Sequence, residues 1–139
     1  MIVVYIVFIV LATIFIRTTE ASAPDREVDI PLSIIEDPVK SYAYREVVRY
    51  FGALEWEAFN SLIKGESGWN YIVRNKTTGA CGIGQANPCE KMGLGDDWQN
   101  YEKQIDWTIQ YVNDRYGTPT KAYQFWLSKA EPHPEQHWY

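Results

Sequence analysis

A glutamate ends an apolar row near the middle of the sequence, where a core residue would be expected. Leu54, Ala58 and Leu62 recur at the spacing of one helix face, and a further step of four residues reaches Glu66. Apolar surroundings disfavour a charged carboxylate, so we expect the pKa of Glu66 to be raised. A carboxylic acid still protonated near neutral pH can donate a proton to a departing oxygen, as glycosidic bond cleavage requires. The alternative is a helix-end glutamate turned into solvent.

The segment after Glu66 is rich in glycine and contains both cysteines. Seven of the nine glycines lie within residues 65–95, which predicts a long, structured loop in place of a regular element. A bridge between Cys81 and Cys89 would close a nine-residue loop, worth roughly 2.5 kcal/mol in the chain-entropy estimate. Zinc is not expected, because no histidine lies near this pair. The pattern predicts a disulfide, with two free thiols as the alternative.

Helices are expected on both sides of this loop, over residues 37–51, 54–65, 96–116 and 120–129. Asp37 is the expected N-cap of the first helix and Pro38 lies in its first turn. Asp96 and Gln99 have capping-box spacing at the start of the third helix, and Thr120 is expected to cap the fourth. No strand-like alternation of useful length occurs, so the expected fold class is mainly α.

Composition excludes one broad class of function. The chain has 139 residues and a formal net charge of −5, which argues against a nucleic-acid binder that neutralises phosphates. The 46% hydrophobic and 22% charged fractions fit a folded globular protein. The length allows one domain with additional segments.

The first sixteen residues are uncharged and apolar, and Arg17 ends the run. As a helix they would span roughly 24 Å, a little short of a bilayer core of about 30 Å. Ala21-Ser22-Ala23 has the small-x-small pattern of a cleavage site. We therefore expect export to the periplasm, the cell envelope or the exterior. Residues 1–23 would be a cleaved signal peptide or a retained anchor built on residues 1–16. Residues 24–36 would be a linker, followed by a folded domain over 37–139.

Two linked motifs resemble those of the soluble lytic transglycosylase family. Residues 66–70 read Glu-Ser-Gly-Trp-Asn, and residues 79–85 read Gly-Ala-Cys-Gly-Ile-Gly-Gln. In that family a Glu-Ser pair ends a helix, and a Gly-Leu-Met-Gln-type segment follows across a loop. The resemblance implies a lysozyme-like (goose-type) helical domain that acts as a monomer without cofactor or metal. The implied substrate is peptidoglycan, cut between N-acetylmuramic acid and N-acetylglucosamine to leave a 1,6-anhydro end.

Carried over residue by residue, the resemblance implies that Glu66 is the sole catalytic acid and base. Ser67 would orient Glu66 or the substrate's N-acetyl group, with a helix-end hydroxyl as the alternative. Gln85 would hydrogen-bond a sugar, with a loop-stabilising amide as the alternative. Gly82 would let the backbone approach the sugar closely, with an ordinary turn glycine as the alternative. Tyr111 would line the groove and face Glu66, with a packing tyrosine as the alternative.

The remaining substrate-binding candidates are Ile83 in the second motif, Tyr123 and one or two tryptophans. Tyr123 lies in an Ala-Tyr-Gln triplet that resembles the family's Ala-Tyr-Asn motif. Trp69 is the tryptophan we most expect to stack on a sugar, because it follows Glu66 by three residues. Gly84 stands where the family motif usually has a bulky apolar residue, so we expect one wall of the sugar site to be missing. Further stacking candidates are Trp98, Trp107, Trp126 and Trp138.

Two other functions remain open. A lysozyme-type hydrolase would combine Glu66 with a water-positioning aspartate, for which the candidates are Asp96, Asp97 and Asp106. A glycan-binding or envelope-assembly module would keep the fold but have no catalytic activity. His133 and His137 lie in a tail that we expect to be solvated, so they are not expected to bind metal.

Overall fold

The described part of the chain contains four α-helices, three short 3₁₀ helices and no strand. The computed structural model describes residues 31, 34 and 36–130. The predicted signal or anchor segment, most of the predicted linker and residues 131–139 lie outside the described residues. The elements, in order, are α2 (Pro38–Phe51), η1 (Ala53–Glu55), α3 (Trp56–Ser67), η2 (Cys89–Met92), η3 (Gly95–Gln99), α4 (Tyr101–Tyr116) and α5 (Pro119–Ala130). The expectation of a mainly helical protein is confirmed.

Helix α2 begins as its sequence predicts. Asp37 Oδ1 accepts hydrogen bonds from the backbone N–H groups of Val39 (3.0 Å) and Lys40 (3.2 Å), which would otherwise have no partner in the first turn. The helix ends before Gly52. Ile34, inside the predicted linker, is buried in the same core cluster as Val39.

Helix α3 begins two residues later than predicted, because the chain first makes the 3₁₀ turn η1. Leu54 lies in that turn and is 97% exposed, so it is not part of the apolar row. The buried residues of the second half of α3 are Leu62 and Ile63. Gly68 ends the helix in a left-handed conformation and donates its N–H to the carbonyl of Lys64. Glu66 therefore does lie in the last turn of α3.

The predicted starts of the last two helices are wrong. Asp96 lies in η3, and α4 begins after Asn100, whose Oδ1 accepts from the N–H of Lys103 at 3.0 Å. Helix α5 begins at Pro119, so Thr120 is helical and not a cap. The N–H and the Oγ1 of Thr120 both donate to Glu55 Oε2, each at 2.8 Å. The local cap of α5 is Thr118, whose Oγ1 accepts from the N–H of Lys121 at 3.3 Å, and the Glu55 carboxylate adds a contact from a distant turn.

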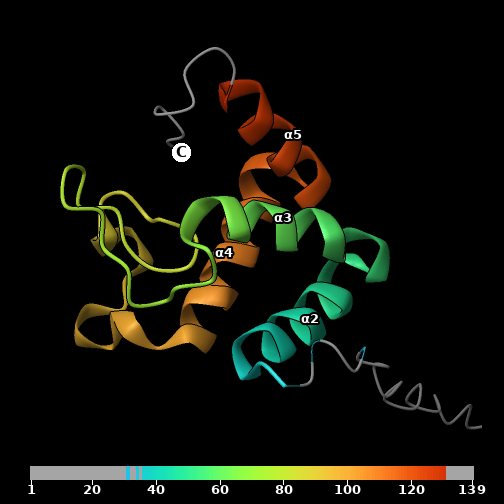
Figure 1. Cartoon of the computed structure of the whole chain (residues 1–139), viewed down its shortest axis with the longest axis horizontal. Coiled ribbons are helices and arrows are strands. Elements are labelled where there is room, and N and C mark those ends of the chain that lie inside the picture. The colour runs from blue at the N-terminus through green and yellow to red at the C-terminus, as the bar shows by residue number, and fades with distance from the viewer. Residues whose placement is uncertain (1–30, 32–33, 35, 131–139) are drawn as a thin grey trace, which may run out of the picture.

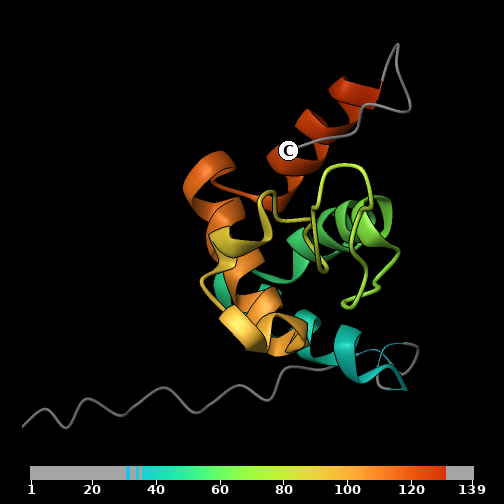
Figure 2. The same ribbon diagram turned by 90° about the vertical axis from the view of Figure 1, so that its left-hand side faces the viewer.

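Helix α3 lies in the middle of the domain, where it contacts α2, α4 and α5 (Figure 1). Its main core residues are Phe59 and Ile63, which pack with Val47 of α2 and with Ile105 and Ile109 of α4. The central loop lies beside the C-terminal end of α3. In Figure 2, where the loop faces the viewer, it also lies next to α4. The fold thus brings the end of α3, the loop and α4 together.

Candidate functional site

Glu66 lines a narrow pocket between α3, the central loop and α4, which we call the Glu66 pocket. Its described lining residues are Leu62, Ile63, Glu66, Gly84, Trp107, Thr108, Tyr111 and Val112. Among them Glu66 is the one acidic residue, and its Oε1 atom is buried. The enclosed space is about 10 Å³, room for roughly one water molecule. The walls are mainly apolar and aromatic, and the Glu66 side chain as a whole is half-buried.

An open hollow continues from this pocket along α4, and we call it the α4 hollow. It measures about 510 Å³ and is lined by Trp107, Gln110, Tyr111, Asp114 and Arg115. That volume is within the range of small-molecule binding sites. Since Trp107 and Tyr111 line both spaces, a ligand in the hollow would lie beside Glu66.

Aromatic rings form the shared wall. The rings of Trp107 and Tyr111 stack with centroids 5.0 Å apart and an interplanar angle of 19°. Arg115 Nη1 donates to the Tyr111 hydroxyl at 2.6 Å, and its guanidinium lies 5.7 Å from the centre of that ring. Burial raises the pKa of Tyr116, Arg115 opposes that rise, and Tyr111 and Glu66 add to it. Tyr116 is thus held neutral close to Glu66. A flat, rigid aromatic wall of this kind suits an apolar face of a ligand.

Gln104 of α4 fixes the central loop against the helix. Its side chain is fully buried, and its Oε1 accepts from the N–H of Ile83 at 2.7 Å. Its Nε2 donates to the carbonyls of Tyr71 (2.9 Å) and Trp98. A Cβ on Gly82, which has a φ of +75°, would lie 2.5 Å from Gln104 Oε1. The lack of a side chain at Gly82 therefore lets Gln104 approach the loop backbone. The contact that Gly82 makes is with the protein interior.

The Cys81–Cys89 disulfide is present, as the sequence predicts, with the two Cα atoms 5.4 Å apart. Both cysteines are buried in a small cluster with Ala86 and Met92, against which Trp107 packs. The bridge thus holds the segment with Gly84, the loop residue that lines the Glu66 pocket, next to the aromatic wall.

Replacing both cysteines by Ser should lower the free energy of unfolding by roughly 2.5 kcal/mol, because the open chain gains conformational entropy. The loosened segment should be Gly82–Gln85, whose amides should exchange faster in hydrogen–deuterium exchange before the helices melt. Reductant should have the same effect on the native chain and none on the double Cys→Ser variant. Unchanged exchange in Gly82–Gln85 would contradict a positional role for the bridge.

Gly84 has no room for the larger residue that the family motif usually has at this position. A Cβ on Gly84 would lie 2.7 Å from Thr108 Oγ1 and 3.1 Å from Thr108 Cγ2. Thr108 is itself fixed, because its hydroxyl donates to the carbonyl of Gln104 at 2.7 Å. The wall that we expected to be missing is occupied by α4.

Gly84→Leu should therefore destabilise the protein by about 1–3 kcal/mol, since the new side chain overpacks the contact with Thr108. Adding Thr108→Ala removes both clashing atoms and should recover part of this loss. A double-mutant cycle of urea-unfolding free energies measures the coupling. Strict additivity of the two substitutions would show that they do not meet.

Two motif residues use their polar groups within the protein. Ser67 Oγ donates to the carbonyl of Ile63 at 3.4 Å, which is the helix-end alternative considered for it. Gln85 Nε2 donates to the carbonyl of Gly82 at 2.9 Å, which is the loop-stabilising alternative. Gln85 is half-buried and lies close to the Glu66 pocket, next to Gly84.

Three other candidates are not among the described residues that line the Glu66 pocket. Trp69 packs against the main core beside Trp56, and its Nε1 donates to Asn60 Oδ1 at 3.0 Å. The side chain of Ile83 is fully buried in that core, so it packs and does not face a ligand. Tyr123 stacks on Trp126 along α5 at a centroid distance of 6.0 Å.

Asp97 and Asp106, which could assist Glu66, interact with other residues, whereas Asp114 lies in the α4 hollow. Asp106 accepts from the Tyr42 hydroxyl at 3.0 Å, and Asp97 pairs with Lys103 at 2.5 Å, which lowers its pKa. Asp114 lines the α4 hollow and accepts from Gln110 Nε2 at 2.7 Å. Asp114 is not among the aspartates that the sequence suggested for this role.

In the sequence Trp107 is one of five candidate tryptophans, and no pattern there points to Thr108 or Lys91. Trp107, Tyr111 and Asp114 recur at i, i+4 and i+7, so one face of α4 meets the ligand space. That spacing was a usable signal. Its value depended on knowing that this face of α4 lies beside the end of α3.

Comparison with protein-family models, with curated proteins and with solved structures gives no match for this chain. Residues 31, 34 and 36–130 include no helix with the length and apolar character needed to cross a membrane. The same residues include no cluster of three or more side chains that could together bind a metal ion. Any proposal about function therefore rests on the site itself.

Proposed function

We propose that this protein is an exported enzyme with a lysozyme-like fold that cleaves peptidoglycan strands by lytic transglycosylation. The observation that carries the proposal is a single carboxylic acid at the end of α3, in a pocket of apolar and aromatic side chains. General-acid catalysis needs a proton donor that stays protonated near neutral pH, and such surroundings favour that state.

The reaction would use Glu66 twice. Its acid proton goes to the glycosidic oxygen as the bond from muramoyl C1 to that oxygen breaks, and the departing glucosamine unit takes up the proton. The muramoyl C6 hydroxyl then bonds to C1, and the Glu66 carboxylate accepts the hydroxyl proton. The products are a 1,6-anhydromuramoyl end and a new glucosamine end, with the acid restored. No water is consumed, so one carboxylic acid is sufficient.

The α4 hollow gives the glycan strand a place beside this acid. A sugar ring is too large for the 10 Å³ Glu66 pocket but fits the 510 Å³ hollow. The stacked rings of Trp107 and Tyr111 offer an apolar surface for a sugar face. Trp107 thus takes the stacking role that we expected of Trp69.

A second candidate is a hydrolase, and Asp114 is the observation that favours it. Inverting glycosidases place a second carboxylate roughly 6.5–9.5 Å from the acid, with a water between them. Asp114 lines the hollow that adjoins the Glu66 pocket. In this mechanism Asp114 would activate the water.

Mass spectrometry of the products separates the two reactions. Peptidoglycan sacculi are incubated with the full chain, and the released muropeptides are weighed. Anhydro ends, lighter by one water than hydrolysed ends, support transglycosylation. Reducing-end muramic acid without anhydro product supports hydrolysis, and Asp114→Asn should then abolish release. Under transglycosylation, Asp114→Asn leaves the product type unchanged.

A further inference from the structure

A second small hollow adjoins the Glu66 pocket on the side of the central loop, and we call it the loop hollow. Its lining residues are Gly84, Gln85, Ala86, Asn87, Lys91, Trp107 and Tyr111. Gly84, Trp107 and Tyr111 also line the Glu66 pocket. A ligand that occupies the site beside Glu66 can therefore extend a substituent into the loop hollow.

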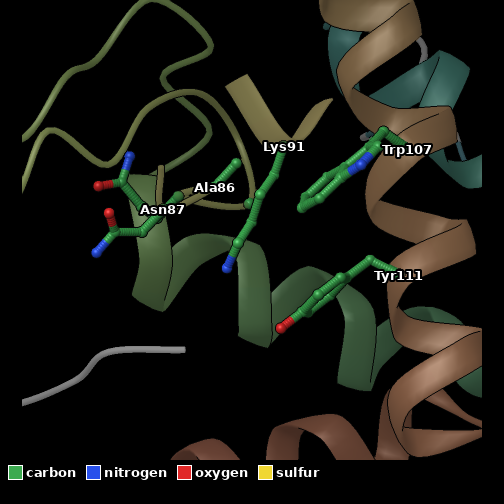
Figure 3. Close-up of a pocket in the computed structure, with 7 residues that line it drawn as sticks. Ala86, Asn87, Lys91, Trp107 and Tyr111 are labelled. Carbon is green, nitrogen blue, oxygen red and sulfur yellow. The ribbon is translucent and has the colours of Figure 1, made fainter. Parts of the chain in front are cut away.

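Lys91 brings a positive charge to this hollow. Figure 3 shows its side chain passing the Trp107 ring, with the ammonium group directed to the space between Asn87 and Tyr111. In the described part of the chain this ammonium takes part in no salt bridge. It is a cation available to a ligand, in a chain whose net charge is −5.

The backbone that bears Lys91 is anchored. Lys91 belongs to the one-turn helix η2, which begins at the disulfide-bonded Cys89. The next residue, Met92, is buried in the cluster with that disulfide. The base of the side chain is therefore fixed relative to the aromatic wall, which reduces the entropy cost of binding a partner.

The loop hollow can admit one oxygen of a small anionic group, whose other atoms would lie at its exposed edge beside Lys91. The enclosed space is about 10 Å³, too small for a sugar ring. An ammonium and a carboxamide at one edge can both donate to a carboxylate, while Trp107 and Tyr111 shield one side from water. A neutral carbonyl could still accept a hydrogen bond from the ammonium but would lack the ion-pair attraction of a carboxylate.

We propose that Lys91, assisted by Asn87, binds a free carboxylate carried by the muramic acid unit of the substrate. This inference rests on the proposed function and gives the proposed enzyme a preference for acidic glycan strands. The carboxylate has two sources, the lactyl group of a muramic acid without a peptide stem or a side group of the stem itself. In both cases the recognised chemistry is a carboxylate one substituent away from the sugar at Glu66.

The test measures binding by isothermal titration calorimetry, with the full chain carrying Glu66→Gln so that no ligand is cleaved. Three disaccharide probes are compared. The first has a free lactyl carboxylate, the second has a peptide stem with free carboxylates, and the third has the same stem fully amidated. Adding Lys91→Gln should weaken binding of a carboxylate-bearing probe roughly three- to tenfold, and the loss should shrink at high salt. The probe whose binding is weakened by Lys91→Gln identifies the source of the carboxylate.

Matched variants guard against a general effect of charge or folding. Lys76→Gln removes another exposed lysine from the same part of the chain and should leave all three dissociation constants unchanged. Lys91→Arg keeps the charge and should retain most of the preference. Equal weakening of the amidated probe by Lys91→Gln, or no weakening of any probe, overturns the inference.

Failure of the proposed function would look different. If the native chain releases no muropeptides but Lys91 still discriminates the probes, the anionic site stands and the catalytic proposal falls. If the native chain releases anhydro muropeptides and Lys91→Gln changes no dissociation constant, only the anionic site falls. Absence of binding to every probe overturns the inference as well.

Discussion

Replacing Glu66 by Gln is expected to reduce muropeptide release from sacculi by roughly 10²–10⁴-fold, the usual contribution of a general acid. The amide keeps the size and shape of the side chain but has no acidic proton to donate. Since Glu66 Oε1 is buried beside Leu62 and Ile63, the isosteric amide should fit the same space. The midpoint of thermal unfolding should therefore change little, and binding to intact glycan should persist.

The matched control is Glu57→Gln. Glu57 lies on the same helix but is exposed at its start, so this variant should keep full activity. Release is measured by mass spectrometry and unfolding by circular dichroism on all three proteins. If Glu66→Gln digests sacculi as fast as the native chain, Glu66 is not the acid. A large fall in its unfolding midpoint would instead assign Glu66 a structural role.

Gln104→Leu is expected to lower the free energy of unfolding by about 2–4 kcal/mol. The amide side chain is fully buried and serves three backbone groups, those of Ile83, Tyr71 and Trp98. Leucine has a similar volume but can neither accept nor donate, so these groups lose their partner in the protein. Desolvated polar groups without a partner are the costly outcome, whereas the volume change is small.

Urea unfolding followed by tryptophan fluorescence gives the free energy for this variant. Gln110→Leu is the comparison, because Gln110 is on the exposed face of the same helix and should cost no more than about 0.5 kcal/mol. Hydrogen exchange of Gly82–Gln85 should increase in Gln104→Leu under native conditions. Equal costs for the two variants would show that the three hydrogen bonds add no net stability.

Much of the helical framework was accessible from local sequence signals. The Asp37–Pro38 start of α2 acts within one turn, so the residues that decide it are neighbours in the chain. The start of α4 and the partner of Thr120 in α5 were not accessible in this way. Asn100 competes with Asp96 for the N-cap of α4, and the partner of Thr120 is Glu55, which is distant in sequence.

The candidate site was accessible to a similar degree. A carboxylate in line with Leu62 indicated a group held among apolar side chains, and Glu66 does line an apolar pocket. Trp69 was the expected sugar-stacking residue because it follows Glu66 closely in sequence, yet its indole packs beside Trp56. Trp107 is far from Glu66 in sequence and lines its pocket because α4 crosses the end of α3.

The sequence by itself determined the helical class, the glycine-rich loop with its disulfide, and the position of Glu66 in the last turn of its helix. These features depend on spacing and on conformational preferences that act over a few residues. Only the tertiary structure decided which face of α4 meets Glu66, why position 84 has no side chain, and where the ammonium of Lys91 lies. Such contacts arise when helices and loops pack together, so they depend on the positions of residues far apart in the chain.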